Sequence, residues 1–213
     1  MPRWIVHESL GEFCGISRNL MHEVSKFIDL ELDHDKGRLI AYSHWDPNKL
    51  YEMASEVYEK YGVEGVKAML HHHLMDYVCS LLTKLKYGAL VRHIVREIKR
   101  TGFVVVYEDV NTGQVYTNPS ARGLLRTISL RRGEAVEFVY NKVKTMVNNV
   151  LNLINKDFSK QRDDVEKLLY SLSRDMKECI EKSVRRLVYI HIISSLNKSH
   201  ENPCKSIRSR DQL

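Results

Sequence analysis

Two apolar seams near the C-terminus constrain the fold of this chain more than any other feature. The first lies within residues 134–155, where its members recur at alternating steps of four and three: Val136, Tyr140, Val143, Val147, Val150 and Ile154. The second lies within residues 164–196 and has similar spacing: Val165, Leu169, Leu172, Met176 and Cys179. Such spacing is typical of helices that pack lengthwise against one another. Because a short polar segment joins the seams, the sequence predicts a long antiparallel helical hairpin.

Most of the preceding chain is also predicted to be helical. Residues 1–10 have an apolar, strand-like character, whereas helical spacing of apolar residues is found in four further segments: 11–30, 46–62, 63–88 and 89–100. Asp46 is a suitable N-cap, Pro47 suits a first helical turn, and Gly62 is expected to end the second of these helices.

The periodicity changes after residue 102. The segment FVVVYEDVNTGQVYTN, residues 103–118, is rich in valine and tyrosine and has Asn111-Thr112-Gly113 at its centre. This combination predicts a β-hairpin. The next segment, PSARGLLRTISLRRG, is interpreted as a short helix and a loop.

The predicted fold is therefore mainly α: a helical bundle with one β-hairpin near 103–118 and a long antiparallel helix pair at the C-terminus. Its expected parts are a His-rich helical domain (1–100), the β-hairpin with a basic connection (101–133), the helical hairpin (134–196) and a disordered tail (197–213). The helical hairpin is expected to join two copies of the chain as a homodimer.

The composition also predicts the cellular compartment of the protein and the kind of organism it comes from. No run of eighteen apolar residues and no signal peptide is found, so we expect a cytoplasmic protein without a membrane partner. The cysteines are far apart and no CxxC occurs, which favours free, buried thiols in a reducing compartment. Glutamine is rare while Lys, Arg, Glu and Val are common, as in many thermophile proteins.

Histidine is the residue type that points most directly to chemistry. The chain has 10 histidines, and most of them precede residue 74. His72 and Asp76 are four residues apart and His73 and Asp76 are three apart, so a helix would bring them together at the margin of its apolar face. Imidazole and carboxylate groups are common ligands of transition metals. The alternative is that each histidine is an inert, hydrogen-bonded residue at the edge of the core.

A second constellation is His34-Asp35-Lys36-Gly37-Arg38, in which Gly37 favours a turn. Adjacent residues of a regular helix diverge by about 100°, so His34 and Asp35 can meet one metal only where the chain turns. Metal-assisted hydrolysis of a phosphoester needs a carboxylate that holds or deprotonates water and cations that face the phosphoryl oxygens. Asp35 could do the former, and Lys36 and Arg38 the latter.

This pentapeptide resembles the His-Asp-x-Gly-Lys/Arg signature of HD-domain metal-dependent phosphohydrolases. The resemblance spans residues 7–76 at most and implies a largely helical fold that binds a divalent metal: Mn, Fe, Co, Ni or Zn. It implies that His34, Asp35, His72 and Asp76 hold the metal, with His7 or His73 as a further ligand. Asp35 would also orient the attacking water, and Lys36 and Arg38 would neutralise phosphoryl charge. The substrate would be a phosphoester of a nucleotide or nucleic acid.

A rival reading places function in the basic centre of the chain. The formal net charge of +6 favours phosphate-bearing partners. A basic helix followed by a hairpin resembles the second half of a winged-helix DNA-binding domain, which here would be dimeric. The expected phosphate contacts are Arg92, Arg96, Lys99, Arg100, Arg122, Arg126, Arg131 and Arg132. A third reading is a non-catalytic helical assembly protein that oligomerises through 134–196.

Overall fold

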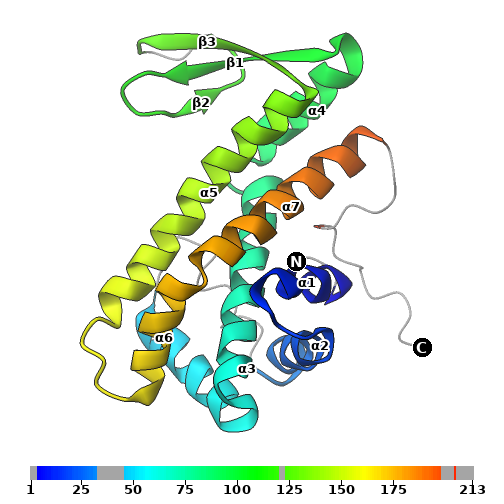
Figure 1. Ribbon diagram of the computed structural model, residues 1–213. Coiled ribbons are helices and arrows are strands. Elements are labelled where there is room, and N and C mark those ends of the chain that lie inside the picture. Colours follow the sequence, from blue (N-terminus) through cyan, green and yellow to red (C-terminus); the bar gives the residue numbers. More distant parts are fainter. Residues whose placement is uncertain (1–3, 33–45, 120–122, 198–203, 205–213) are drawn as a thin grey trace.

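The computed structural model describes residues 4–32, 46–119, 123–197 and 204, and within them it confirms the mainly α fold (Figure 1). The helical elements are α1 (Trp4–Gly11), the 3₁₀ turn η1 (Glu12–Cys14), α2 (Arg18–Lys26), the π-helical turn η2 (Phe27–Glu31), α3 (Pro47–Thr83), α4 (Gly88–Thr101), α5 (Arg132–Asp157), α6 (Asp164–Asp175) and α7 (Lys177–Leu196). The strands are β1 (Phe103–Asp109), β2 (Val115–Tyr116) and β3 (Leu125–Arg131).

Helix α3 is the axis around which the other helices pack. It contacts α1, α2, α4, α5, α6 and α7. In its second half Ala68, Met69, Leu74 and Met75 are completely buried. A helix with apolar residues on all sides belongs in the interior of a bundle. Any polar side chain on this part of α3 is therefore removed from water as well.

The boundaries of α3 follow the signals in its sequence. The Asp46 carboxylate caps the first turn by accepting a hydrogen bond of 3.0 Å from the Asn48 N–H. Gly62 adopts φ 66° and ψ −159°, a backbone conformation open to glycine. The chain kinks there and continues as a helix, so the predicted segments 46–62 and 63–88 are two parts of one bent element.

The antiparallel pair predicted at the C-terminus is present. α5 packs along both α6 and α7, and the second member of the pair is divided at Met176. The seam of α5 is buried within this chain, as Val143, Val147 and Ile154 show by exposing 1% of their surface or less. The coiled-coil-like spacing of the α5 seam therefore reflects packing of α5 against helices of the same chain.

The hairpin is also present, but it belongs to a sheet of three strands in the order β2-β1-β3. Strand β3 corrects the interpretation of residues 119–133 as a short helix and a loop. It pairs antiparallel with β1, and Leu130 lies opposite Val104. Leu130 and Val104 are both buried, so β3 gains apolar burial by pairing with a strand about twenty residues before it. The residues next to β3 in the sequence do not reveal that β1 is its partner, so the local pattern did not predict the strand.

The strand-like interpretation of residues 1–10 is wrong as well, because Trp4–Gly11 forms helix α1. His7 and Leu10, three residues apart, are buried on one face of this helix. That face packs on α2 and α3. Tertiary contacts thus decide the conformation of a short segment whose own periodicity is weak.

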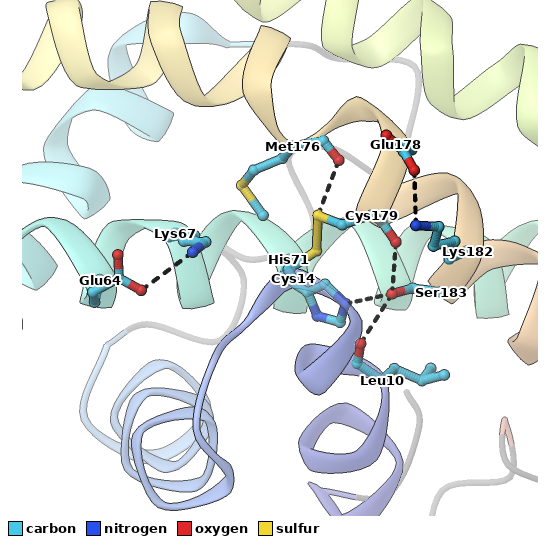
Figure 2. The surroundings of a disulfide bond; sticks show 10 residues. All are labelled: Leu10, Cys14, Glu64, Lys67, His71, Met176, Glu178, Cys179, Lys182 and Ser183. Carbon is cyan, nitrogen blue, oxygen red and sulfur yellow. Dashed lines mark hydrogen bonds and ion pairs between the residues drawn. A yellow bond between two sulfur atoms is a disulfide. The ribbon is translucent and has the colours of Figure 1, made fainter.

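The expectation of free thiols is wrong. Cys14 is bonded to Cys179, and Cys79 is bonded to Cys204; no free cysteine is found among the described residues. Figure 2 shows how the first bridge joins the turn after α1 to the start of α7. The separations along the chain, 165 and 125 residues, hide both pairings from a reading of spacing. Of the tail predicted to be disordered (197–213), only Asn197 and Cys204 are described, and Cys204 is tied to α3.

We expect the double substitution Cys14→Ser/Cys179→Ser to lower the Tm by about 10 °C. A bridge that closes so long a loop is worth about 4 kcal/mol through the entropy of the unfolded chain. Thermal unfolding followed by circular dichroism measures the change. Reducing agent opens both bridges, so it should destabilise the wild type more than the double substitution does, and it should have no effect on a variant that lacks all four cysteines. Four reactive thiols in the denatured, unreduced protein would contradict both bridges.

Candidate metal centre

Three elements that are distant in sequence bring two histidines and two aspartates together. α1 supplies His7, η2 supplies Asp29, and the buried half of α3 supplies His72 and Asp76 one turn apart. The short π-helical turn at η2 changes the helical phase after α2, and Asp29 lies within it, between Ile28 and the exposed Leu30. We call these four residues the His/Asp cluster.

The cluster has the dimensions of a metal site. His7, His72 and Asp76 each offer one ligand atom, and these three atoms lie within 4.8 Å of one another. His7 Nε2 is 3.2 Å from Asp76 Oδ1, and His72 Nε2 is 3.4 Å from Asp76 Oδ2. Ligand atoms bound at about 2.0–2.1 Å in tetrahedral geometry are about 3.3–3.4 Å apart. The two separations that involve Asp76, one to each of its oxygens, are close to that edge length.

Neighbouring groups fix the orientation of two cluster members. His72 Nδ1 is 3.0 Å from Ser25 Oγ, which leaves Nε2 directed at the carboxylates. Asp29 Oδ1 lies 3.4 Å from His72 Nε2, while Asp29 Oδ2 accepts a 2.7 Å hydrogen bond from Trp4 Nε1. Such supporting contacts are typical of groups that hold metal ligands in position. Asp29 is therefore placed as a fourth ligand or as a base beside the other three.

Several polar atoms of the cluster have no hydrogen-bond partner although they are buried. They are His7 Nδ1, His7 Nε2, His72 Nε2 and Asp76 Oδ1. The His–Asp separations are short enough for ion pairs, yet their directions do not satisfy hydrogen-bond geometry. These nitrogen and oxygen atoms converge on one point without a hydrogen bond between them. A cation at that point would give them a common partner.

Burial and mutual charge set the protonation of the cluster. Burial by itself would lower the pKa of His72, but the charge of Asp76 and the close contact with the Asp29 carboxylate raise that pKa to about 10. Burial lowers the pKa of His7, and the charge of His72 lowers it further. Burial would raise the pKa of Asp76, but the charge of His72 and the close contacts with both histidines hold it well below its usual range.

These shifts leave the metal-free cluster with uncompensated charge. Two carboxylates face one imidazolium, since His7 is neutral. A divalent cation that displaced the proton of His72 would bring the sum to zero. Uncompensated charge is costly in the interior, so the cluster fits a divalent ion better than it fits a proton.

The predicted ligands separate into three groups. His7, His72 and Asp76 come together, whereas His34 and Asp35 lie outside the described residues, as do Lys36 and Arg38. His73 points elsewhere: its Nε2 lies 2.8 Å from Met53 Sδ. Burial, followed by the charge of His72, lowers the pKa of His73 to about 3, so this ring is neutral.

Asp29 is the cluster member that the sequence analysis did not identify. The sequence does hint at its role, because Asp29 directly follows Phe27 and Ile28 at the apolar end of a helical segment. A charge in that position needs a partner when the segment is buried. Trp4, which donates to it, carries no signal of that role in the sequence.

The basic residues proposed to contact nucleic acid mostly have partners within the protein. Arg96 and Arg100 both pair with Glu97, and Arg126 pairs with Glu108. Arg92 donates to a backbone carbonyl, Lys99 is exposed on α4, and Arg122 lies outside the described residues. Arg131 and Arg132 are at the start of α5. The face of α4 is thus less positive than its sequence suggests.

The shifted pKa of His72 predicts opposite pH dependences with and without metal. In EDTA, the stability contributed by the His72 imidazolium is complete below about pH 6.5, the unfolded value, and is lost as pH rises through about 10. With metal, affinity should rise over the same range because metal must displace that proton. Urea unfolding of the wild type and of His72→Gln at each pH measures both effects by difference. Identical pH profiles for the two proteins in EDTA would contradict the charged state of His72.

No described helix is both long enough and apolar enough to cross a membrane. No protein-family model matches the chain, and comparison with curated proteins and with solved structures gave no match either.

Proposed function

We propose that this protein binds a divalent transition metal in the His/Asp cluster and hydrolyses a phosphoester of a nucleotide or nucleic acid. The observation that carries the proposal is the convergence of His7, His72 and Asp76, from two elements, onto one point in the interior. The resemblance of residues 34–38 to the HD-domain signature supports the reaction class. Phosphohydrolase chemistry is therefore the part that rests on sequence, and metal binding the part that rests on geometry.

The donor set suits the metals expected from the sequence. Imidazole nitrogens with carboxylate oxygens bind Zn, Mn, Fe, Co and Ni. Sulfur ligands are absent from the cluster, because the four cysteines form two disulfides. A bound divalent ion would supply Lewis acidity toward a phosphoryl oxygen and toward water.

The carboxylates form the accessible edge of the cluster. The side chains of Asp29 and Asp76 are 14% and 11% exposed, whereas those of His7 and His72 are each 1% exposed. A substrate would therefore approach from the side of Asp29. The hydrogen bond from Trp4 holds one oxygen of this carboxylate, which leaves the other to accept a proton from water.

Residues 34–38 follow η2 closely in the chain. In the proposed reaction Asp35 orients water, while Lys36 and Arg38 neutralise the phosphoryl oxygens. The proposal requires that Lys36 and Arg38 reach the accessible edge, and the few residues between Asp29 and this segment are compatible with that requirement. Substitutions in residues 34–38 test whether these side chains contribute to the reaction.

The environment and assembly of the protein are further parts of the proposal. Disulfides are rare in most cytoplasmic proteins but occur in those of hyperthermophiles. The low glutamine content and the two bridges are therefore compatible with a cytoplasmic protein of a thermophile. A homodimer through 134–196 would have to use exposed side chains of this segment other than the α5 seam, because that seam is buried inside the chain.

Elemental analysis of purified, tag-free, undialysed protein should find one transition metal per chain. His72→Gln and Asp76→Asn should each remove most of it, because each deletes a ligand, while circular dichroism stays close to that of the wild type. His93→Ala is the control: His93 contacts the Val105 carbonyl on β1, away from the cluster, so its loss should leave metal content unchanged. Protein that is metal-free and also fails to bind added Mn²⁺ or Zn²⁺ would refute the proposal.

Hydrolysis is tested separately from binding. Asp29→Asn should retain metal with affinity reduced about tenfold, and its rate on a chromogenic phosphodiester should fall by at least as much. Asp35→Ala should lower both metal content and rate, whereas Lys36→Ala/Arg38→Ala should lower the rate alone. A metal-loaded wild type inactive toward nucleotides, RNA, DNA and the chromogenic ester would leave a metal-binding protein without phosphohydrolase activity.

A further inference from the structure

A second candidate site lies between the first two turns of α5 and residues 182–193 of α7. It is a hollow of about 600 Å³, a size typical of pockets for small organic ligands. None of its lining residues belongs to the His/Asp cluster. Its α7 wall consists of side chains three and four residues apart, which is one face of that helix.

The hollow is strongly cationic. Arg132, Lys182, Arg185 and Arg186 line it, and Glu137 is the one carboxylate in the lining; Lys182 pairs with Glu178 beside the hollow at 2.7 Å. Arg185 pairs with Glu137 at 2.7 Å. Among the described residues, no carboxylate pairs with Arg132 or Arg186, and Arg132 makes only a 3.5 Å contact with the Asn197 side chain. Two guanidinium groups thus retain free donors at the same opening, and guanidinium groups bind phosphate oxygens in pairs of hydrogen bonds.

The rest of the lining is aromatic and aliphatic. The Tyr189 ring is 46% exposed, and the Arg186 guanidinium lies 5.8 Å from its centroid. Val136 and Ile193 also line the hollow. An exposed ring flanked by a cation and apolar side chains is a surface on which a planar base can stack.

The start of α5 adds a further feature to the same hollow. The Arg131 N–H is taken by Glu134 Oε2 at 2.7 Å, but the N–H groups of the first turn beyond it have no intrahelical acceptor. Gly133 lies in that turn, and a Cβ added there would meet no atom within 4 Å. An anion can therefore come close to the backbone at the positive end of the α5 dipole.

We propose that this hollow binds a nucleoside di- or triphosphate, with the phosphates at Arg132, Arg186 and the first turn of α5 and the base on Tyr189. Charge complementarity selects a phosphate-bearing ligand. The exposed ring and the volume select one that also carries a base and is small enough to be enclosed. The site is separate from the His/Asp cluster and does not require metal there.

The test is isothermal titration of the full chain with ATP in EDTA, so that an ion in the His/Asp cluster contributes nothing. Wild type should bind, and Arg132→Ala and Arg186→Ala should each raise the Kd about tenfold or more. Gly133→Leu, whose side chain would extend into the hollow, should abolish binding without unfolding α5. Arg174→Ala is the matched control: Arg174 also lies over a tyrosine ring, Tyr170, but it does not line the hollow. Its Kd should equal that of the wild type.

Ligand variants test the division of roles within the site. Tripolyphosphate should bind about tenfold more weakly than ATP because it lacks the stacked base, and Tyr189→Ala should remove this difference. Asp76→Asn should bind ATP normally, which separates this site from the metal centre. The proposal is overturned if wild type does not bind ATP in EDTA, if the arginine variants bind as well as Arg174→Ala, or if Asp76→Asn loses binding. Binding of single-stranded oligonucleotide without binding of ATP would overturn it too.

Discussion

Three consecutive histidines in the buried half of α3 are the constraint on which the placement of the surrounding helices depends. Each ring is removed from water and meets a different group: His71 Nε2 lies 3.1 Å from Ser183 Oγ on α7, His72 Nδ1 lies 3.0 Å from Ser25 Oγ on α2, and His73 Nε2 lies 2.8 Å from Met53 Sδ earlier on α3. Successive helical residues point about 100° apart, so these partners approach from separate directions. Since buried polar groups without partners are costly, displacing α2 or α7 would leave a histidine unsatisfied. Only His72 carries charge, and it is the one that faces the carboxylates.

The burial and charge of His72 also explain how two carboxylates can stay ionised in the interior, where a cation could bind them. A buried carboxylate pair would ordinarily take up a proton. Here His72 keeps Asp29 and Asp76 ionised, and burial together with the His72 charge keeps His7 neutral and able to donate a lone pair. The ligands are therefore in the protonation states that a metal needs, apart from the single proton on His72. His7 has no hydrogen-bond partner at either ring nitrogen, whereas His71 and His73 each have one partnered nitrogen, so His7 differs from the two histidines outside the cluster.

The sequence predicted the parts of this protein that are encoded in local periodicity and end signals. The α5 seam, the Asp46 cap, the Gly62 break and the hairpin around Gly113 are all readable over a few turns of chain, and the structure has each of them. His72 and Asp76 were grouped correctly because one helix fixes their relation. Asp29, strand β3 and both disulfides were not found, because each depends on a partner distant in sequence. His7 was placed with the α3 residues only through the resemblance at residues 34–38, which themselves lie outside the described chain.

Helix α7 links the two candidate sites by presenting a different face to each. On its inner face Ser183 Oγ is hydrogen-bonded to His71 Nε2 and donates to the Leu10 carbonyl, which joins α7 to α3 and α1 (Figure 2). One turn earlier, Cys179 is bonded to Cys14, so this end of α7 is fixed covalently to the segment that follows His7. On the outer face of the same turns lie Lys182 and Arg186, which line the cationic hollow. A ligand there would meet a wall that is already immobilised by contacts made for the core, and its binding would cost little ordering of the backbone. The contacts that fix α7 to α1 and α3 thus also make the hollow a rigid surface.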